Sequence, residues 1–148
     1  MRKKKLLVAL LAVVLVFAMS ATALASDIQP YRASDYLGTY SGSITAQSGK
    51  QMKVTFSVVG TGMMTEVGAD HITIQKKVNG VWTYDRTISH EDEGYENMMR
   101  SNAVSHGTSV YFTGTAGVEY RAVVTAYAAD STGSDTGDVT TSSATCYQ

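Results

Sequence analysis

The chain of 148 residues predicts an all-β domain, an antiparallel β-sandwich of about seven strands. Three observations lead to this fold class. Apolar residues alternate with polar or small residues along much of the chain, a period of two rather than the 3.6 of a helix. The composition favours strands, since threonine, valine and tyrosine are frequent and only one proline is present. Clusters of glycine, serine and asparagine separate the runs, and short strands at this spacing are typical of sandwiches.

The first 25 residues predict a signal helix that precedes the domain and is removed on secretion. Arg2–Lys5 is basic, Leu6–Met19 is apolar, and small residues at Ala23 and Ala25 precede a cleavage site between Ala25 and Ser26. The apolar run of about 14 residues is shorter than the roughly 20 needed to cross a bilayer. We therefore expect a secreted, extracellular protein with no stable membrane anchor after cleavage.

Cleavage divides the chain into a signal peptide at residues 1–25, an N-terminal extension at residues 26–35 and one β-sandwich domain at residues 36–148. The signal holds four of the 12 basic residues and no acidic residue, so the mature charge is 8 − 13, or −5. This charge disfavours nucleic acid and anionic membranes as partners, because phosphate binding needs clustered lysine and arginine. The single cysteine, Cys146, is either a passive thiol or the source of an intermolecular disulfide.

Five of the seven expected strands rest on their own alternation. The defining positions are Tyr36, Gly38 and Tyr40; Val54, Phe56 and Val58; Ile72 and Ile74; Val110 and Phe112; and Tyr120, Ala122, Val124 and Ala126. We expect strands at residues 36–46, 51–59, 70–78, 81–88, 108–114, 119–128 and 138–145.

The sharpest local prediction is a β-hairpin between residues 70–78 and 81–88. Asn79 and Gly80 supply the two positive-φ residues of a type I′ turn, whose twist matches the flanking strands. Residues 90–102 lack alternation, so we expect a long connection there with one helical turn at residues 96–100. Gly60–Met64 lacks the lysine and the helix of a phosphate-binding loop, and we expect it to be a turn between sheets.

The segment Gly114–Val124 resembles the sixth strand of immunoglobulin-like and fibronectin-type-III-like domains, in which a tyrosine after a glycine-containing corner begins an alternating strand. In this resemblance Tyr120 packs its ring inward and ties its hydroxyl to nearby backbone. Residues 31–145 also resemble the small, secreted, uncharacterised single-domain proteins of Gram-positive bacteria. The resemblance implies an immunoglobulin-like fold and an extracellular location. It implies no catalytic residue.

No catalytic, cofactor-binding or metal-binding motif is predicted. The acidic stretch around Glu91 and the aspartates of residues 130–138 offer oxygen ligands, but a charged solvated loop explains them better than a calcium site. His71, His90 and His106 are scattered over separate elements, and none lies in a motif that pairs it with a nucleophile. We therefore expect neither an enzyme nor a cofactor.

Strand parity places a candidate binding surface on the hairpin. Around a two-residue turn Lys77 opposes Trp82, Gln75 opposes Tyr84 and Thr73 opposes Arg86, and opposed residues share a face. If Ile72 and Ile74 point into the core, Gln75, Trp82, Tyr84 and Arg86 lie on the outer face. In an immunoglobulin-like topology the strand that carries Tyr120 neighbours this hairpin and adds Tyr127 to the predicted site. Aromatic rings flanked by polar groups suit both sugar rings and protein partners. The alternative is a bulge that reverses the parity and buries Trp82.

The function predicted from the sequence is a non-catalytic binding or interaction module of the cell envelope or extracellular space. Its partner would be a cell-envelope glycan or an extracellular protein. One alternative is a structural, self-assembling protein that uses exposed strand edges or Cys146. Another is a small secreted inhibitor or effector that acts through its loops.

Overall fold

The computed structural model describes residues 34–148, so the predicted signal peptide and most of the N-terminal extension lie outside the described residues. The elements are β1 (Leu37–Ala46), β2 (Gln51–Val78), β3 (Val81–Ser89), η1 (Glu96–Met98), β4 (Met99–Thr113), β5 (Glu119–Ala129), β6 (Ser134–Thr140) and β7 (Ala144–Thr145). Every strand pairing is antiparallel, which confirms the all-β prediction of seven strands. Within residues 34–148 no helix is long and apolar enough to span a membrane.

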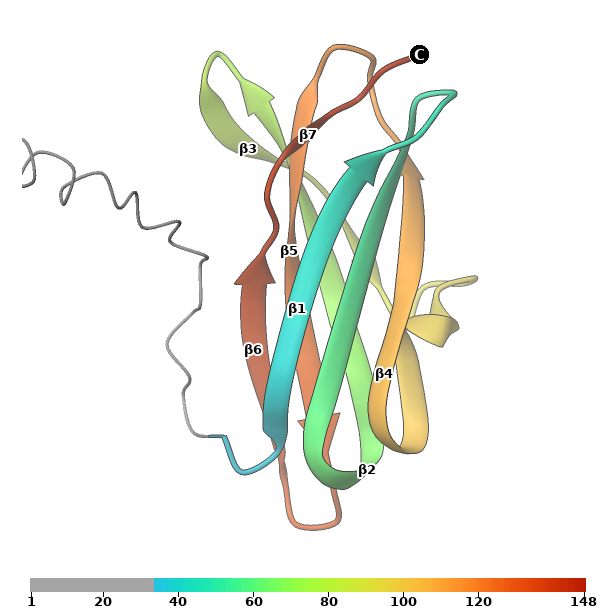
Figure 1. The fold of residues 1–148 in the computed structure, drawn as a ribbon, viewed down its shortest axis with the longest axis vertical. Helices are drawn as coiled ribbons and strands as arrows, with labels where there is room; N and C mark the ends of the chain where they lie inside the picture. The colour runs from blue at the N-terminus through green and yellow to red at the C-terminus, as the bar shows by residue number, and fades with distance from the viewer. Residues whose placement is uncertain (1–33) are drawn as a thin grey trace, which may run out of the picture. The chain divides into compact units, whose positions relative to one another are not determined.

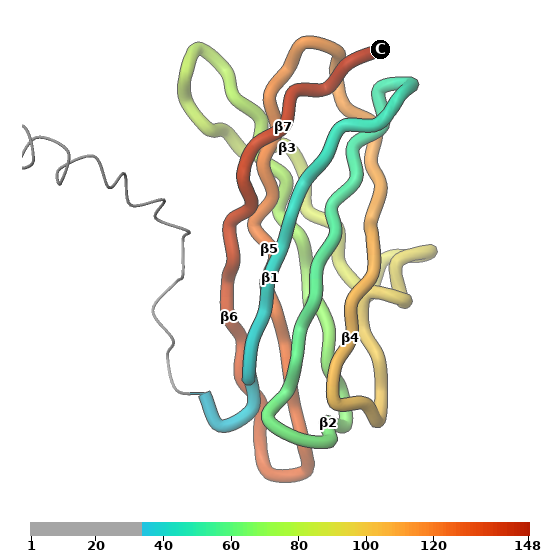
Figure 2. The backbone as a smooth tube through the Cα atoms, viewed as in Figure 1, coloured from blue at the N-terminus to red at the C-terminus, as the bar shows by residue number. Residues whose placement is uncertain are grey.

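The seven strands form one strongly curled sheet, a half-barrel, because β2 runs through both of its walls (Figures 1 and 2). Residues 51–59 of β2 pair with β1 and with the second part of β4, whereas residues 64–68 pair with the first part of β4 and residues 66–76 pair with β5. The register against β4 shifts between Val59 and Met64, where β2 bends back. The two strands expected at residues 51–59 and 70–78 are therefore one strand, and the turn expected at Gly60–Met64 is a bend within it.

Two further strand boundaries differ from the prediction. β4 begins at Met99 rather than at residue 108, and the helical turn expected at residues 96–100 is the shorter η1. No residue of β4 before Val110 is buried, so the hydrophobic pattern carried no signal for that part of the strand. The strand expected at residues 138–145 is split into β6 and β7, and β6 also contains no buried residue.

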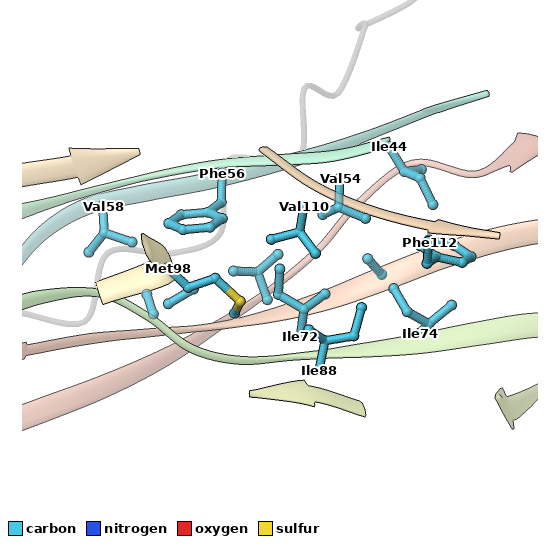
Figure 3. Packing of buried hydrophobic residues seen from close by; sticks show 14 of the residues in the cluster. Ile44, Val54, Phe56, Val58, Ile72, Ile74, Ile88, Met98, Val110 and Phe112 are labelled. Atoms are coloured by element: carbon cyan, nitrogen blue, oxygen red, sulfur yellow. The ribbon is translucent and has the colours of Figure 1, made fainter. Parts of the chain in front are cut away.

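The core lies between the two walls and is built from the alternating positions (Figure 3). Val54, Phe56 and Val58 from one wall face Ile72 and Ile74 from the other, and all are almost fully buried. Val110, Phe112, Tyr120, Ala122, Val124 and Ala126 are buried with them, as the alternation predicts. Met98 from η1 closes one side of this core. In β1 a register shift between Leu37 and Thr39 buries Leu37 in place of the expected Tyr36.

Two contacts position the β4–β5 turn and the C-terminal segment. The backbone N–H of Thr115 donates a hydrogen bond of 3.0 Å to the hydroxyl of Tyr120, the corner expected from the resemblance. Cys146 is 1% exposed, and a side chain added at Gly114 would meet both its Sγ and the ring of Tyr120. The thiol is therefore covered by the core, and an intermolecular disulfide would require the C-terminal segment to open.

Candidate functional site

The β2–β3 hairpin positions the candidate site. Asn79 and Gly80 adopt φ values of 51° and 80°, both positive as a type I′ turn requires. Lys77 pairs with Trp82 and Gln75 pairs with Tyr84, the expected register. Because Ile72 and Ile74 are fully buried on the opposite face, these four side chains share the outer face of the half-barrel wall.

Arg86 departs from the expected site because of a bulge. The register shifts between Ile74 and Gln75, so Asp85 is the extra residue and Arg86 pairs with Ile74 instead of Thr73. The bulge turns Arg86 toward the core side, where its guanidinium lies 5.5 Å from the ring centroid of Phe112. The prediction that Arg86 stands beside Trp82 on the outer face is therefore wrong. The same bulge brings Ile88 into the core.

Trp82 is half-buried on the outer face under two cations. The guanidinium carbon of Arg121 lies 4.6 Å from the centroid of its ring, and the ammonium of Lys77 lies 5.3 Å away. Arg121 reaches this position from β5 and donates from Nε to Oε1 of Gln75 at 2.7 Å. Such cation–π contacts hold the indole ring in place. We call Gln75, Lys77, Trp82, Tyr84 and Arg121 the hairpin cluster.

Tyr127 does not belong to the hairpin cluster. It pairs with Gly68 of β2 and Thr136 of β6, near the far end of β5 from Arg121. Six residues of extended strand separate Tyr127 from Arg121, which is about 20 Å. One compact ligand cannot contact Trp82 and Tyr127 together at that separation.

Two carboxylates balance part of the positive charge around the cluster. Glu119 accepts hydrogen bonds from the Ser143 hydroxyl and the Lys77 ammonium, and these two contacts lower the pKa of its carboxyl. Burial alone would raise the pKa of Asp85, but the Arg86 and Lys76 hydrogen bonds outweigh it and hold that pKa below its usual value. Arg121 forms no ion pair with any residue among 34–148. Its charge is therefore free to meet a ligand.

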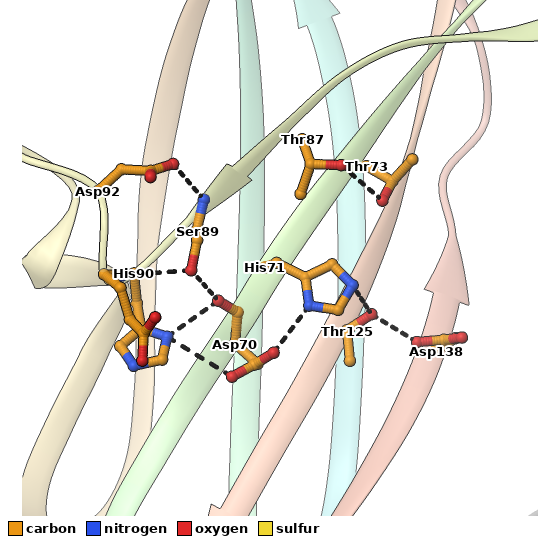
Figure 4. A network of polar contacts seen from close by, with 10 residues as sticks. Asp70, His71, Thr73, Thr87, Ser89, His90, Asp92, Thr125 and Asp138 are labelled. Atoms are coloured by element: carbon orange, nitrogen blue, oxygen red, sulfur yellow. Dashed lines mark hydrogen bonds and ion pairs between the residues drawn. The ribbon is translucent and has the colours of Figure 1, made fainter.

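A second polar group crosses the same face nearer the middle of the strands (Figure 4). Nδ1 of His71 lies 2.7 Å from Oδ2 of Asp70, and its Nε2 lies 3.2 Å from the hydroxyl of Thr125. Thr125 also donates to Oδ1 of Asp138 at 2.6 Å. We call Asp70, His71, Thr125 and Asp138 the cross-strand array. No local sequence pattern connects these residues, which come from β2, β5 and β6. The strand register, which pairs His71 with Thr125 and Thr125 with Asp138, is the signal that brings them together.

The direction of the hydrogen bonds in the cross-strand array does not suit a nucleophile. In a hydrolytic triad the hydroxyl donates its proton to Nε2 of the histidine. The Thr125 hydroxyl has one proton, and the Asp138 carboxylate can only accept it. While it is bonded to Asp138, the hydroxyl therefore has no proton to give to Nε2 of His71. The arrangement joins three strands and does not activate Thr125.

The carboxylates of the acidic connections are used as local acceptors. Asp92 accepts the backbone N–H of Ser89 at 2.8 Å, and Glu96 accepts that of Gly94. Asp130 accepts bonds from the backbone and hydroxyl of Thr132, which lower the pKa of its carboxyl. Within the described part of the chain, no group of three or more histidine, cysteine, aspartate or glutamate side chains is arranged to hold a metal ion.

Comparisons with known proteins assign no family. No family model matches the sequence, and no curated protein matches it. Among solved structures the chain is similar to Spo0M, the sporulation control protein from Bacillus subtilis, with a TM-score of 0.42 and 8% identity. The match covers 74% of this chain and 49% of that one, so this chain spans about half of that protein's length. A likeness this distant carries no argument about function.

Proposed function

We propose that this chain is a secreted, non-catalytic binding module of the cell envelope or extracellular space, with the hairpin cluster as its binding face. The observation that carries the proposal is the fixed indole of Trp82, oriented by Arg121 at 4.6 Å and Lys77 at 5.3 Å beside a Tyr84 that is 65% exposed. Aromatic side chains and arginine dominate binding energy at protein surfaces. The predicted signal peptide supports the location.

The chemistry of the cluster favours a glycan that carries acidic groups. A sugar ring can stack its C–H face on Tyr84 or on the free part of Trp82, while Gln75 and Arg121 offer hydrogen bonds to its hydroxyl or carboxylate groups. Arg121 is the deciding residue, because its planar guanidinium binds carboxylates in a bidentate manner and has no carboxylate partner within residues 34–148. We expect acidic oligosaccharides to bind more tightly than neutral ones.

We also infer that the half-barrel is an immunoglobulin-like sandwich in which the second and third strands are continuous. One wall has the order β1-β2-β4 and the other the order β6-β5-β2-β3. These orders match the A-B-E and G-F-C-C′ strands of immunoglobulin-like domains, with β2 serving as both B and C. The Tyr120 to Thr115 hydrogen bond adds support, since it corresponds to the tyrosine corner of that fold.

Self-assembly has less support as an alternative function. Cys146 is covered by the core, which disfavours linkage of copies through its thiol. Among the described strands β3 pairs only with β2 and so presents a free edge, but the bulge at Asp85 interrupts its pairing pattern. Bulges at sheet edges are a common protection against strand addition.

The test is a fluorescence titration of the secreted form with cell-wall polysaccharide fragments, neutral and acidic, because Trp82 is the only tryptophan. We expect the acidic fragments to change the emission of Trp82 saturably. The Tyr84→Ala variant, which keeps the fluorophore, should weaken binding about 30-fold if Tyr84 is a binding hot spot. The Trp82→Ala variant should show the same loss by calorimetry.

Tyr127→Ala is the matched control, since it removes an aromatic ring from the same face about 20 Å away along β5. It should bind the fragments like the wild type. Unchanged binding in both the Trp82 and the Tyr84 variants, with thermal unfolding intact, would refute the proposed binding face.

A further inference from the structure

The basic side chains of the described chain gather at one end of the half-barrel. This end, which we call the hairpin end, holds the turns at residues 47–50, 79–80 and 114–118 and is drawn at the top of Figure 1. Six of the seven lysines and arginines within residues 34–148 lie there, and Arg100 is the exception. They are Lys50, Lys53, Lys76, Lys77, Arg86 and Arg121. Among the described residues only two acidic ones, Asp85 and Glu119, share this end, so the formal charge of its described side chains is 6 − 2, or +4.

The exposed apolar side chains gather at the same end. Of the seven large hydrophobic residues exposed among the described residues, five belong to the hairpin end. They are Val78, Val81, Tyr84, Tyr111 and Tyr147; the other two, Met63 and Val104, lie at the opposite end, where β2 and β4 bend. Two independent distributions, charge and exposed apolar surface, thus converge on one end of the molecule.

The tip of the hairpin is its most apolar point. Val78 and Val81 flank the Asn79-Gly80 turn and are 43% and 63% exposed. The side chain of valine has no hydrogen-bonding group, so its exposure here adds no polar contact to a sugar or to a soluble polyanion. Within residues 34–148, β2 is the only strand that hydrogen-bonds to β3, so the tip stands clear of the other strands (Figure 1).

We propose that the hairpin end docks reversibly on the surface of an anionic lipid bilayer, with Val78 and Val81 in the boundary between headgroups and acyl chains. Apolar side chains enter that boundary, tyrosine and tryptophan favour the headgroup level, and lysine and arginine meet the anionic headgroups. The hairpin end supplies all three, with Val78 and Val81 at the tip and the pair of Lys77 and Trp82 directly behind them. This inference goes beyond the proposed function and does not depend on a glycan.

The net charge of −5 does not prevent such docking, because the negative charge lies elsewhere. Ten of the 12 acidic residues within residues 34–148 are outside the hairpin end. Glu66, at the bend, is twelve strand residues from Val78, which is about 40 Å. The Debye length at physiological salt is only about 8 Å, so salt screens the repulsion between carboxylates at the bend and anionic headgroups at the tip. The expectation that the net charge disfavours an anionic membrane therefore does not apply to this end.

Co-sedimentation of the secreted form with vesicles tests the proposal. One set is pure phosphatidylcholine, and the other contains equal parts of phosphatidylcholine and phosphatidylglycerol. We expect binding to the anionic set, with a partition coefficient that falls as salt is added. The double variant Val78→Ser, Val81→Ser should lower this coefficient roughly 100-fold, since each valine loses the burial of its methyl groups. Lys50→Gln with Lys53→Gln should lower it about 30-fold, since each charge near the surface contributes about fivefold.

The matched control is Met63→Ser with Val104→Ser, which changes two exposed apolar residues at the opposite end. It should bind the anionic vesicles like the wild type. Equal binding to both vesicle sets, or equal loss in the control and in the valine variant, would overturn the proposal. Vesicle binding that persists unchanged in the valine variant and is competed by a soluble polyanion would assign the basic end to a polymer instead. The valine variant keeps Trp82, so its oligosaccharide titration separates failure of this inference from failure of the proposed function.

Discussion

The hairpin cluster and the cross-strand array lie on the same outer face but differ in how far their polar groups are satisfied. In the array each side chain meets the next, at 2.7 Å, 3.2 Å and 2.6 Å from Asp70 through His71 and Thr125 to Asp138. In the cluster the Arg121 guanidinium has one amide partner, and the Tyr84 side chain is mostly exposed. A saturated polar group stabilises its strands, whereas an unsaturated group beside aromatic rings has capacity for a ligand. The difference separates a structural brace from a binding face.

The largest expected effect on stability comes from Asp85. Its carboxylate joins Lys76 and Arg86 on the face of the hairpin opposite to Trp82. Its side chain is 9% exposed and contacts both Lys76 and Arg86. Asp85→Asn should lower the free energy of unfolding by about 2 kcal/mol near neutral pH, a charged-pair value reduced because both cations are partly exposed. Urea unfolding measures the loss, and Asp92→Asn is a control carboxylate in the exposed connection.

The same residue gives a pH dependence with a definite sign. The folded pKa of Asp85 lies below the usual 3.8, so its contribution to stability is present above that value. As the pH falls through the folded pKa, the carboxylate is protonated and the contribution is lost. The stability difference between the wild type and Asp85→Asn should therefore shrink in acid. A difference that grows on acidification would contradict the assignment of the brace to the ionised carboxylate.

The contrast between these regions also shows which features can be predicted from the sequence alone. Local chemistry predicted the Asn79-Gly80 turn and the inward alternation of Ile72 and Ile74, because both depend on neighbours in the chain. A bulge was expected only as an alternative that buries Trp82; the bulge lies instead at Asp85, beyond Tyr84, where Asp85 contacts Lys76 and Arg86 and Ile88 is buried. It changed the face on which Arg86 lies.

The array and the continuity of β2 were also missed, because both depend on pairing between strands that are distant in the sequence. The array joins residues that are up to 68 positions apart, from Asp70 to Asp138, and no local pattern connects them. The continuity of β2 also depends on its pairing with β4, whose first half has no buried residue to mark it. Strand parity therefore placed Gln75, Trp82 and Tyr84 on the outer face correctly and placed Arg86 there wrongly, and it did not connect the residues of the array.

The intermediate effect tests whether the array is a brace. Thr125→Val keeps the shape of the side chain but removes the hydroxyl between His71 and Asp138. We expect a loss of about 1 kcal/mol in the free energy of unfolding, the usual contribution of one hydrogen bond. Oligosaccharide and vesicle binding should be unchanged. A loss of binding without a loss of stability would move the binding face to the array and reverse the comparison.

The smallest expected change in stability tests whether the hairpin cluster, unlike the array, contributes little to folding. Arg121→Lys keeps the positive charge but removes the planar guanidinium that stacks 4.6 Å from Trp82 and holds Gln75. Because the contact is on the surface, the free energy of unfolding should change by no more than about 0.5 kcal/mol. The emission of Trp82 should nevertheless shift, and the preference for acidic over neutral oligosaccharides should fall, since an ammonium cannot bind a carboxylate in a bidentate manner. A stability loss as large as that of Thr125→Val, with the ligand preference retained, would make Arg121 a brace and leave the hairpin cluster without its binding charge.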